Sequence, residues 1–162
     1  MNVFISGSIG ITKLPKRAIE KIDNIIKKEY KILVGDAKGV DLYVQKYLFK
    51  KKYKNAVVYY AGNKIRNNVG QWETKNIVND IAKGKKLYTL KDIEMANDAN
   101  YGLMIWDGKS EGTMNNLSMM KSQNKRFFVV IGEMLIDEKN IESIMKIRNI
   151  QDQDTNIQTE LF

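Results

Sequence analysis

Five short and nearly continuous apolar runs constrain the fold of this chain more than any other feature. They are Val3–Ile5, Ile32–Val34, Ala56–Tyr60, Tyr101–Trp106 and Phe127–Ile131. Segments with apolar residues at three- and four-residue spacing lie between most of these runs. Apolar strands that alternate with helices are typical of a parallel sheet covered on both faces. The pattern therefore predicts a single Rossmann-like, doubly wound α/β domain, with a mainly parallel five-stranded sheet in the order 3-2-1-4-5.

The remaining segments set the expected limits of this domain. Residues 63–86 are polar and poorly periodic, so we expect a long loop with a short helix over Glu73–Ala82 and Trp72 as its apolar anchor. Loops of this length in compact domains are commonly functional. Gln, Asn and Asp dominate after Arg148, which predicts a domain over residues 1–148 and a flexible polar tail over residues 149–162.

Composition removes several kinds of chemistry. The chain has 162 residues and contains no cysteine and no histidine. Disulfides, thiolate nucleophiles, Ser-His-Asp catalysis and metal sites built on Cys or His are therefore excluded. We expect neither a metal nor a cofactor, and any acid–base chemistry must use carboxylates, Lys, Tyr or ordered water.

Charge is unevenly distributed along the chain. Residues 1–132 carry 24 basic and 12 acidic side chains, whereas residues 133–162 carry 3 basic and 7 acidic ones. A basic body favours anionic partners such as nucleotides or nucleic acid, although surface lysines also serve solubility. No run approaches the ~20 apolar residues of a membrane span and no basic leader is present, so we expect a cytoplasmic location without membrane contact.

Three glycine-containing loops follow predicted strands and precede predicted helices. They are Ser6–Gly10, Gly35–Asp41 and Asp107–Thr113. Glycine lets backbone N–H groups face an approaching anion, and a helix N-terminus adds partial positive charge. With the expected strand order, the first and third loops form the two walls of the crevice where strand order reverses. None of the loops matches the P-loop or GxGxxG patterns of common nucleotide-binding proteins.

Side chains in and near these loops could either bind a ligand or have a structural role. Asp36 or Asp107 can hold a ribose hydroxyl, whereas Asp41 is better explained as a helix cap. Backbone amides of Gly7, Ser8, Gly108 and Gly112 can hold a phosphate, which the hydroxyls of Ser110 and Thr113 can assist. Trp72 can stack on a base, although aromatic residues near such crevices are equally often part of the core.

The same residues resemble the SLOG superfamily, and in particular its small YspA-like bacterial or phage members. Ser6-Gly7-Ser8 is similar to a Gly-Ser-Arg element, with Ile9 where Arg is usual, and Gly35–Asp41 is similar to Gly-Gly-Ala-x-Gly-x-Asp. Arg66-Asn67, Lys91-Asp92 and Trp106–Thr113 look like the remaining landmarks. The superfamily includes the LOG nucleotide phosphoribohydrolases, DNA-processing proteins of the DprA type and sensors of nucleotide derivatives. The resemblance implies a Rossmann-like fold and a nucleotide-type ligand.

The resemblance also adds two candidate residues and a departure. It implies ligand contacts by Arg66 and Asn67, so that the candidate binding set is Ser6, Gly7, Ser8, Gly35, Asp36, Gly39, Arg66, Asn67, Trp72, Asp107, Gly108, Ser110, Gly112 and Thr113. Asn116 stands where LOG enzymes carry a catalytic Glu, and an amide cannot act as a general base. Glycosidic hydrolysis would then need Asp107, Glu111 or Asp36 as its carboxylate.

Three functions remain open from the sequence. The first is a module that binds a nucleotide or nucleotide derivative as a sensor or sequestering protein, and the second is a nucleotide N-glycosidase or phosphoribohydrolase. The third is a DNA-binding or sliding-clamp-associated accessory protein, because the last five residues resemble a clamp-docking peptide through Gln158, Leu161 and Phe162. Self-association into a homo-oligomer is compatible with all three.

Overall fold

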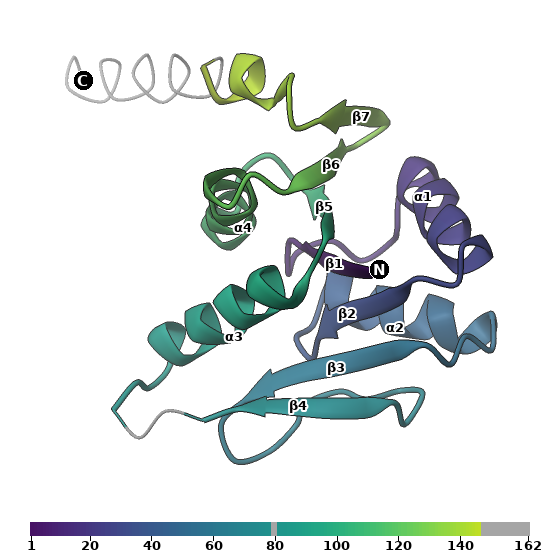
Figure 1. Ribbon diagram of the computed structural model, residues 1–162, viewed down its shortest axis with the longest axis vertical. Coiled ribbons are helices and arrows are strands. Elements are labelled where there is room, and N and C mark those ends of the chain that lie inside the picture. Colours follow the sequence, from purple (N-terminus) through teal and green to yellow (C-terminus); the bar gives the residue numbers. More distant parts are fainter. Residues whose placement is uncertain (79–80, 147–162) are drawn as a thin grey trace.

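The computed structural model describes residues 1–78 and 81–146 (Figure 1). The first half contains β1 (Asn2–Gly7), α1 (Lys16–Lys27), β2 (Lys31–Gly35), α2 (Val40–Lys50), β3 (Ala56–Ala61) and β4 (Glu73–Ile77). The second half contains α3 (Lys85–Asp98), β5 (Tyr101–Trp106), α4 (Glu111–Ser122), β6 (Arg126–Ile131) and β7 (Met134–Asp137). A further helical segment covers residues 141–146. All five predicted strands are present.

The sheet has seven strands in the order β4-β3-β2-β1-β5-β6-β7. Its five central strands follow the predicted order, and β1 to β6 all pair in parallel. β7 is the exception, since it pairs with β6 in the antiparallel sense. It returns through a turn at Gly132, whose φ of 57° lies in the left-handed region that glycine adopts readily. The architecture is thus a mostly parallel, Rossmann-like α/β domain.

The helix predicted over Glu73–Ala82 is wrong, because the structure forms β4 over Glu73–Ile77. This strand pairs with β3 from Val57↔Glu73 to Ala61↔Ile77 and lies at the edge of the sheet. An edge strand packs little apolar surface, and the side chains of β4 are half-buried or exposed. Its polar sequence therefore lacks the apolar run by which the central strands were found.

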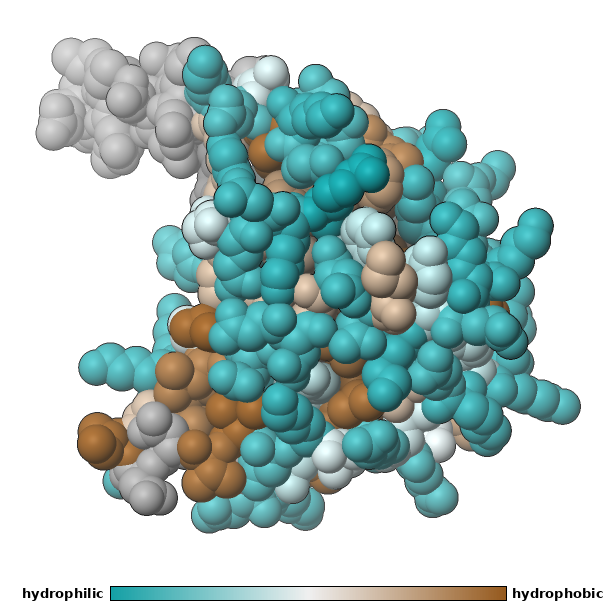
Figure 2. Space-filling view, viewed as in Figure 1, coloured by the Kyte–Doolittle hydropathy of each residue, from teal (hydrophilic) through white to brown (hydrophobic). Residues whose placement is uncertain are grey.

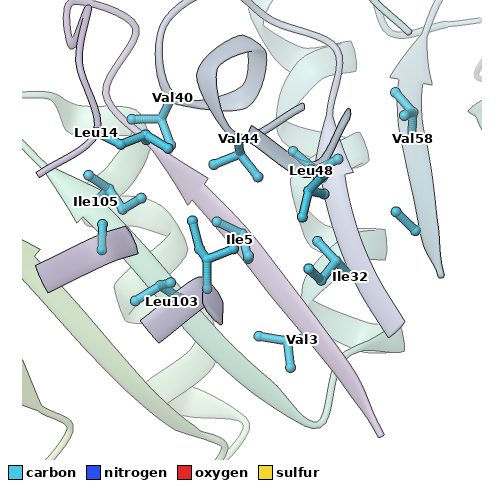
Figure 3. Close-up of a cluster of buried hydrophobic side chains, with 14 of the residues drawn as sticks. Val3, Ile5, Leu14, Ile32, Val40, Val44, Leu48, Val58, Leu103 and Ile105 are labelled. Atoms are coloured by element: carbon cyan, nitrogen blue, oxygen red, sulfur yellow. The ribbon is translucent and has the colours of Figure 1, made fainter. Parts of the chain in front are cut away.

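Helices cover both faces of the sheet, as predicted. Alternate residues of β1 point to opposite faces, so that Ile5 packs with α1 and α2 while Phe4 packs with α3 and α4. The first of these clusters joins Ala18 and Ile22 of α1 to side chains of α2 and of the central strands (Figure 3). The two clusters fix the carboxyl ends of the strands in relation to the helix N-termini that follow them.

The surface is mostly hydrophilic in the view of Figure 2, apart from an apolar patch near the end of β4 and the start of α3. Val78, which follows β4, and Ile81 are 72% and 93% exposed there. Among the described residues, no helix is both long enough and apolar enough to cross a bilayer. The predicted tail over residues 149–162, including Gln158, Leu161 and Phe162, lies outside the described residues.

Candidate functional site

The two predicted crevice walls meet at the carboxyl ends of β1 and β5. The Ser8 and Ser110 hydroxyl oxygens lie 2.7 Å apart, although the sequence separates them by more than a hundred residues. The backbone N–H of Asp107 donates to the same Ser8 oxygen at 3.0 Å, and the Ser110 hydroxyl donates to Thr113 at 2.9 Å. The loops are therefore in contact, and three hydroxyls fill the seam between them.

Gly7 of the first loop and Gly39 of the second allow close packing of the backbone. A Cβ at Gly7 would lie 2.1 Å from the carbonyl oxygen of Ile105, and one at Gly39 would lie 2.4 Å from the backbone of Ile9. Gly39 also has a φ of 75°. These glycines hold β1 against β5 and the second loop against the first, so the role that the structure gives them is to shape the site.

Glycines of the third loop differ, because they face open space. A Cβ at Gly108 or Gly112 would meet no atom within 4 Å. Gly112 lies in the first turn of α4, after Ser110 at the N-cap position, and Glu111 in the same turn is exposed. Free backbone N–H groups and the positive end of the helix dipole make this turn suited to an anion.

Asp107 closes the third loop upon itself. Its Oδ1 accepts hydrogen bonds of 2.8 Å from the backbone N–H groups of Lys109 and Ser110. Burial alone would raise the pKa of Asp107, but these backbone donors lower it below the usual value. The carboxylate is thus kept ionised, which suits a role in holding the loop and accepting a hydroxyl better than a role as a proton donor.

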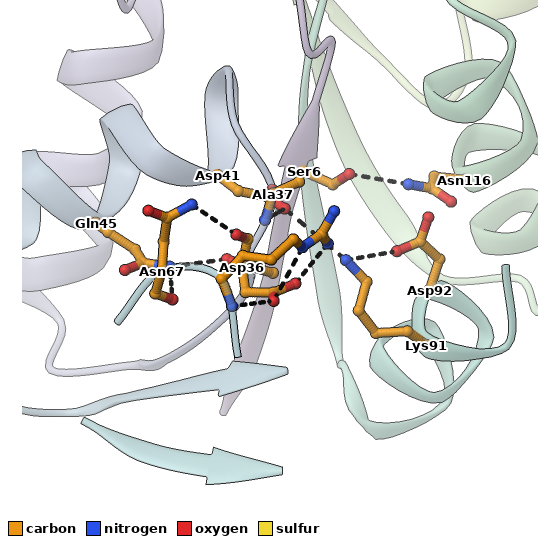
Figure 4. Close-up of polar contacts among 11 residues, drawn as sticks. Ser6, Asp36, Ala37, Asp41, Gln45, Asn67, Lys91, Asp92 and Asn116 are labelled. Carbon is orange, nitrogen blue, oxygen red and sulfur yellow. Dashed lines mark hydrogen bonds and ion pairs between the residues drawn. The ribbon is translucent and has the colours of Figure 1, made fainter. Parts of the chain in front are cut away.

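Asp36, Arg66 and Asn67 form a brace between the second loop and the segment after β3 (Figure 4). The buried carboxylate of Asp36 accepts hydrogen bonds from the Arg66 backbone N–H at 2.9 Å, from Nε at 3.1 Å and from Nη2 at 2.6 Å. Asn67 donates to the carbonyl oxygen of Asp36 at 2.9 Å. The Arg66 guanidinium also lies over the Tyr88 ring, 4.5 Å from its centroid. Asp36, Arg66 and Asn67 were predicted to contact a ligand, but these contacts within the protein already use many of their hydrogen-bonding groups.

A second polar group lies deeper, where β1, α3 and α4 meet (Figure 4). The Asn116 side-chain NH₂ donates to the Ser6 hydroxyl at 2.9 Å, but its Oδ1 is buried without a hydrogen-bond partner among the described residues. Lys91, itself buried, lies 3.6 Å from an oxygen of Asp92 and 3.9 Å from one of Asp41. A buried acceptor without a donor is costly in a folded protein, so Asn116 is a natural contact for a ligand N–H or O–H group.

Burial governs the carboxylates of this group. It raises the pKa of Asp41 to about 6, against the lowering effect of Lys91. It also raises the pKa of Asp92, whose charge Lys91 and Asn116 favour. Gly35 is required beside them, because a Cβ there would lie 2.3 Å from the Asp41 carboxylate and 2.6 Å from Lys91 Nζ.

Not every candidate from the sequence reaches the crevice. Trp72 is 7% exposed, donates through Nε1 to the backbone oxygen of Tyr53 at 2.8 Å and belongs to the core on the α1–α2 face. It precedes β4, at the end of the sheet opposite the crevice. Conversely, the buried positions of Lys91 and Gln45 were not predicted from the residues, since single polar residues inside helical segments carry no periodic signal.

Together, the parallel order, the strand reversal at β1 and the glycine loops define a Rossmann-like α/β protein whose first and third loops meet at its switch point. No family model matches the chain, and no curated protein matches it by sequence. Among solved structures, DNA processing protein A from Helicobacter pylori is similar, with a TM-score of 0.61 and 15% sequence identity. The match covers 95% of this chain and 81% of that one, and the structure is described for its single-stranded DNA binding mode. At this identity the likeness concerns the fold.

Proposed function

We propose that the crevice binds a nucleotide or a nucleotide-derived ligand through its phosphate. The observation that supports this most is the first turn of α4, where Ser110 at the N-cap makes no side-chain cap hydrogen bond and a Cβ at Gly112 would enter open space. The hydroxyls of Ser8 and Ser110 lie beside this turn. The unpartnered Oδ1 of Asn116, one turn further along α4, is an independent reason to place a ligand here.

Different residues would bind different parts of the ligand. Backbone amides of Glu111 and Gly112, in the first turn of α4, hold the phosphate, because those of Lys109 and Ser110 already donate to Asp107. The helix dipole of α4 favours its negative charge. Asp107, ionised and exposed, accepts a sugar hydroxyl. Asp36 and Arg66 hold the second loop in place rather than contact the phosphate first, because they already bind each other.

Thermal unfolding in the presence of AMP, ADP-ribose, NAD and cyclic nucleotides tests this proposal. A ligand at 100 times its Kd adds about 2.7 kcal/mol, which raises the Tm of a chain of this size by about 5–10 °C. Gly112→Val should remove the shift without lowering the unliganded Tm, because its side chain enters open space. Ser118→Val, at an exposed position of the same helix, is the matched control and should keep the shift. A full shift in Gly112→Val would show that the crevice is not the site.

Hydrolysis of the ligand is a separate possibility that the same samples address. Free base released during incubation, followed by chromatography, would indicate a nucleotide N-glycosidase. Because Asn116 is an amide, such an activity would depend on a nearby carboxylate, and loss of release in Asp107→Asn with retained binding would identify it. Binding without release supports a sensor or sequestering module.

Single-stranded DNA binding is a second candidate function. It is favoured by the fold likeness to DNA processing protein A, together with a formal net charge of +8. Electrostatic binding of this kind weakens steeply with salt. Anisotropy of a labelled oligonucleotide over a range of salt concentrations tests it, and the absence of binding at low salt would exclude it.

A further inference from the structure

A groove lies between α1 and the amino ends of β1, β5 and β6, far from the crevice at their carboxyl ends. It has a volume of about 250 Å³, and its lining includes Lys21, Lys28, Tyr30, Tyr101, Arg126 and Phe128. Tyr101 and Arg126 are the first residues of β5 and β6. The groove is therefore separated from the nucleotide crevice by the length of the strands.

The groove exists because of the path of the chain after β6. The chain turns into β7 and then into the segment 141–146, whose Ile141 packs in the core on the α3–α4 face. Within residues 1–78 and 81–146, no helix follows β6 onto the α1 face. Phe128 of β6 and Tyr101 of β5 consequently remain only partly buried beside α1.

Aromatic rings form the walls of the groove. The rings of Tyr30 and Tyr101 are nearly parallel, with centroids 6.5 Å apart and planes 9° apart. Lys21 Nζ lies 3.8 Å from the centroid of the Phe128 ring, and Lys28 Nζ lies 5.8 Å from that of Tyr30. Lys21 thus covers one face of Phe128 in the free chain, and a base that stacks on this ring takes the place of the ammonium group. Aromatic rings with lysines beside them are the groups on which single-stranded nucleic acids stack their bases and neutralise their phosphates.

The positive charge of the groove favours an anionic occupant. Its charged lining residues are Lys21, Lys28 and Arg126, and Glu138 offsets Arg126 through Nε at 3.3 Å. A second copy of the chain, with its own formal charge of +8, would bring like charge to this surface. A volume below the ~300–1,000 Å³ of pockets for whole small molecules suits one base, with the backbone passing outside it.

We propose that this groove binds single-stranded nucleic acid, with a base against Tyr30, Tyr101 and Phe128 and phosphates on Lys21 and Lys28. The inference deepens the second candidate function by giving it a surface, and it is independent of nucleotide binding in the crevice.

Fluorescence anisotropy of a short labelled oligo(dT) tests the proposal with matched variants of the full chain. Lys21→Gln/Lys28→Gln should weaken binding and lower the slope of log K against log salt by about 0.7 for each lost phosphate contact. Lys16→Gln/Lys27→Gln removes the same charge from exposed positions of α1 outside the groove and should keep the slope. Phe128→Leu, which keeps an apolar side chain, should weaken binding about fivefold or more.

Several results would overturn the proposal. Equal weakening by both lysine pairs would mean that net charge alone attracts the oligonucleotide. Loss of binding in Gly112→Val with normal binding in the groove variants would place the nucleic acid in the crevice. No binding by the unmodified chain would remove the second candidate function itself. Sedimentation of the same samples completes the test, because a dimer that the groove variants dissociate would make the groove a contact between two copies.

Discussion

The brace between Asp36 and Arg66 leads to an unequal response to two single substitutions. The Asp36 side chain is 0% exposed, whereas that of Arg66 is 40% exposed and rests on Tyr88. Removal of either partner breaks the same ion pair, but the group left behind differs. When Asp36 is replaced, the Arg66 guanidinium can turn toward water. When Arg66 is replaced, the Asp36 carboxylate stays in the interior, with the backbone N–H of residue 66 as its partner.

The two costs can be estimated from these surroundings. Arg66→Ala leaves a buried and uncompensated charge, which costs about 3–5 kcal/mol. Asp36→Ala loses hydrogen bonds to a charged acceptor but strands no buried charge, which costs about 1.5–3 kcal/mol. We therefore expect Arg66→Ala to be the more destabilising change, although Arg66 is the more exposed residue.

Urea unfolding at pH 7 of the unmodified chain, both single variants and the double variant measures this difference. The double variant should recover part of the loss, with a coupling of at least about 1 kcal/mol. Arg17→Ala is the control, because the Arg17–Glu20 pair is 3.5 Å apart and about half exposed, and it should cost less than about 1 kcal/mol. Additive losses, or a larger cost for Asp36→Ala, would refute the reasoning. A small stability cost for Asp36→Ala with loss of the nucleotide shift would instead assign Asp36 to the ligand.

Three other predictions follow from individual contacts. Gly7→Ala should lower stability by at least about 1–3 kcal/mol in urea because its Cβ meets a backbone oxygen, whereas Gly112→Ala should raise it by about 0.5–1 kcal/mol. Ser8→Ala should cost about 1–3 kcal/mol and lower the Tm, because it leaves a backbone N–H of the third loop without its acceptor. Burial raises the pKa of Asp41 from its ordinary value of 3.8 to about 6, so the folded chain holds this proton more tightly than the unfolded chain and its stability falls as pH rises from about 4 to 6. Asp41→Asn should make the urea midpoint depend less on pH over that range, and parallel profiles for the two proteins would contradict the assignment.

The central strands could be predicted because a strand that is buried on both faces of the sheet has a continuous apolar sequence. The five central strands read as unbroken apolar runs, and their order followed from the strand-reversal rule of doubly wound sheets. β4 and β7 escaped prediction, since an edge strand needs no continuous apolar run. Trp72 was hard to place for the opposite reason, because one apolar residue in a polar segment indicates burial without indicating where.

The sequence predicted which loops form the candidate site, but not which role each of their residues has. Loop position follows from strand order, so the first and third loops were expected on either side of the switch point, but the direct contact between Ser8 and Ser110 was not. The pairing of Asp36 with Arg66 depends on how the segment after β3 folds back, and its sequence carries no regular pattern. The buried Lys91 is likewise explained only by its acidic neighbours, one of which lies on another element.

The glycines of the site show why the position of a loop can be predicted from the sequence while the role of each of its residues cannot. A pattern of glycine after a strand predicts backbone exposure to a ligand, yet Gly7, Gly35 and Gly39 are required by neighbouring protein atoms within 3 Å of where a Cβ would lie. Gly108 and Gly112 have no such neighbours. The proposed anion can therefore approach the backbone at Gly108 and Gly112, and at Gly10 of the first loop, but not at Gly7, Gly35 or Gly39. Ligand selectivity should follow the side chains from Asp107 to Asn116, while substitutions at Gly7, Gly35 and Gly39 should change stability before they change affinity.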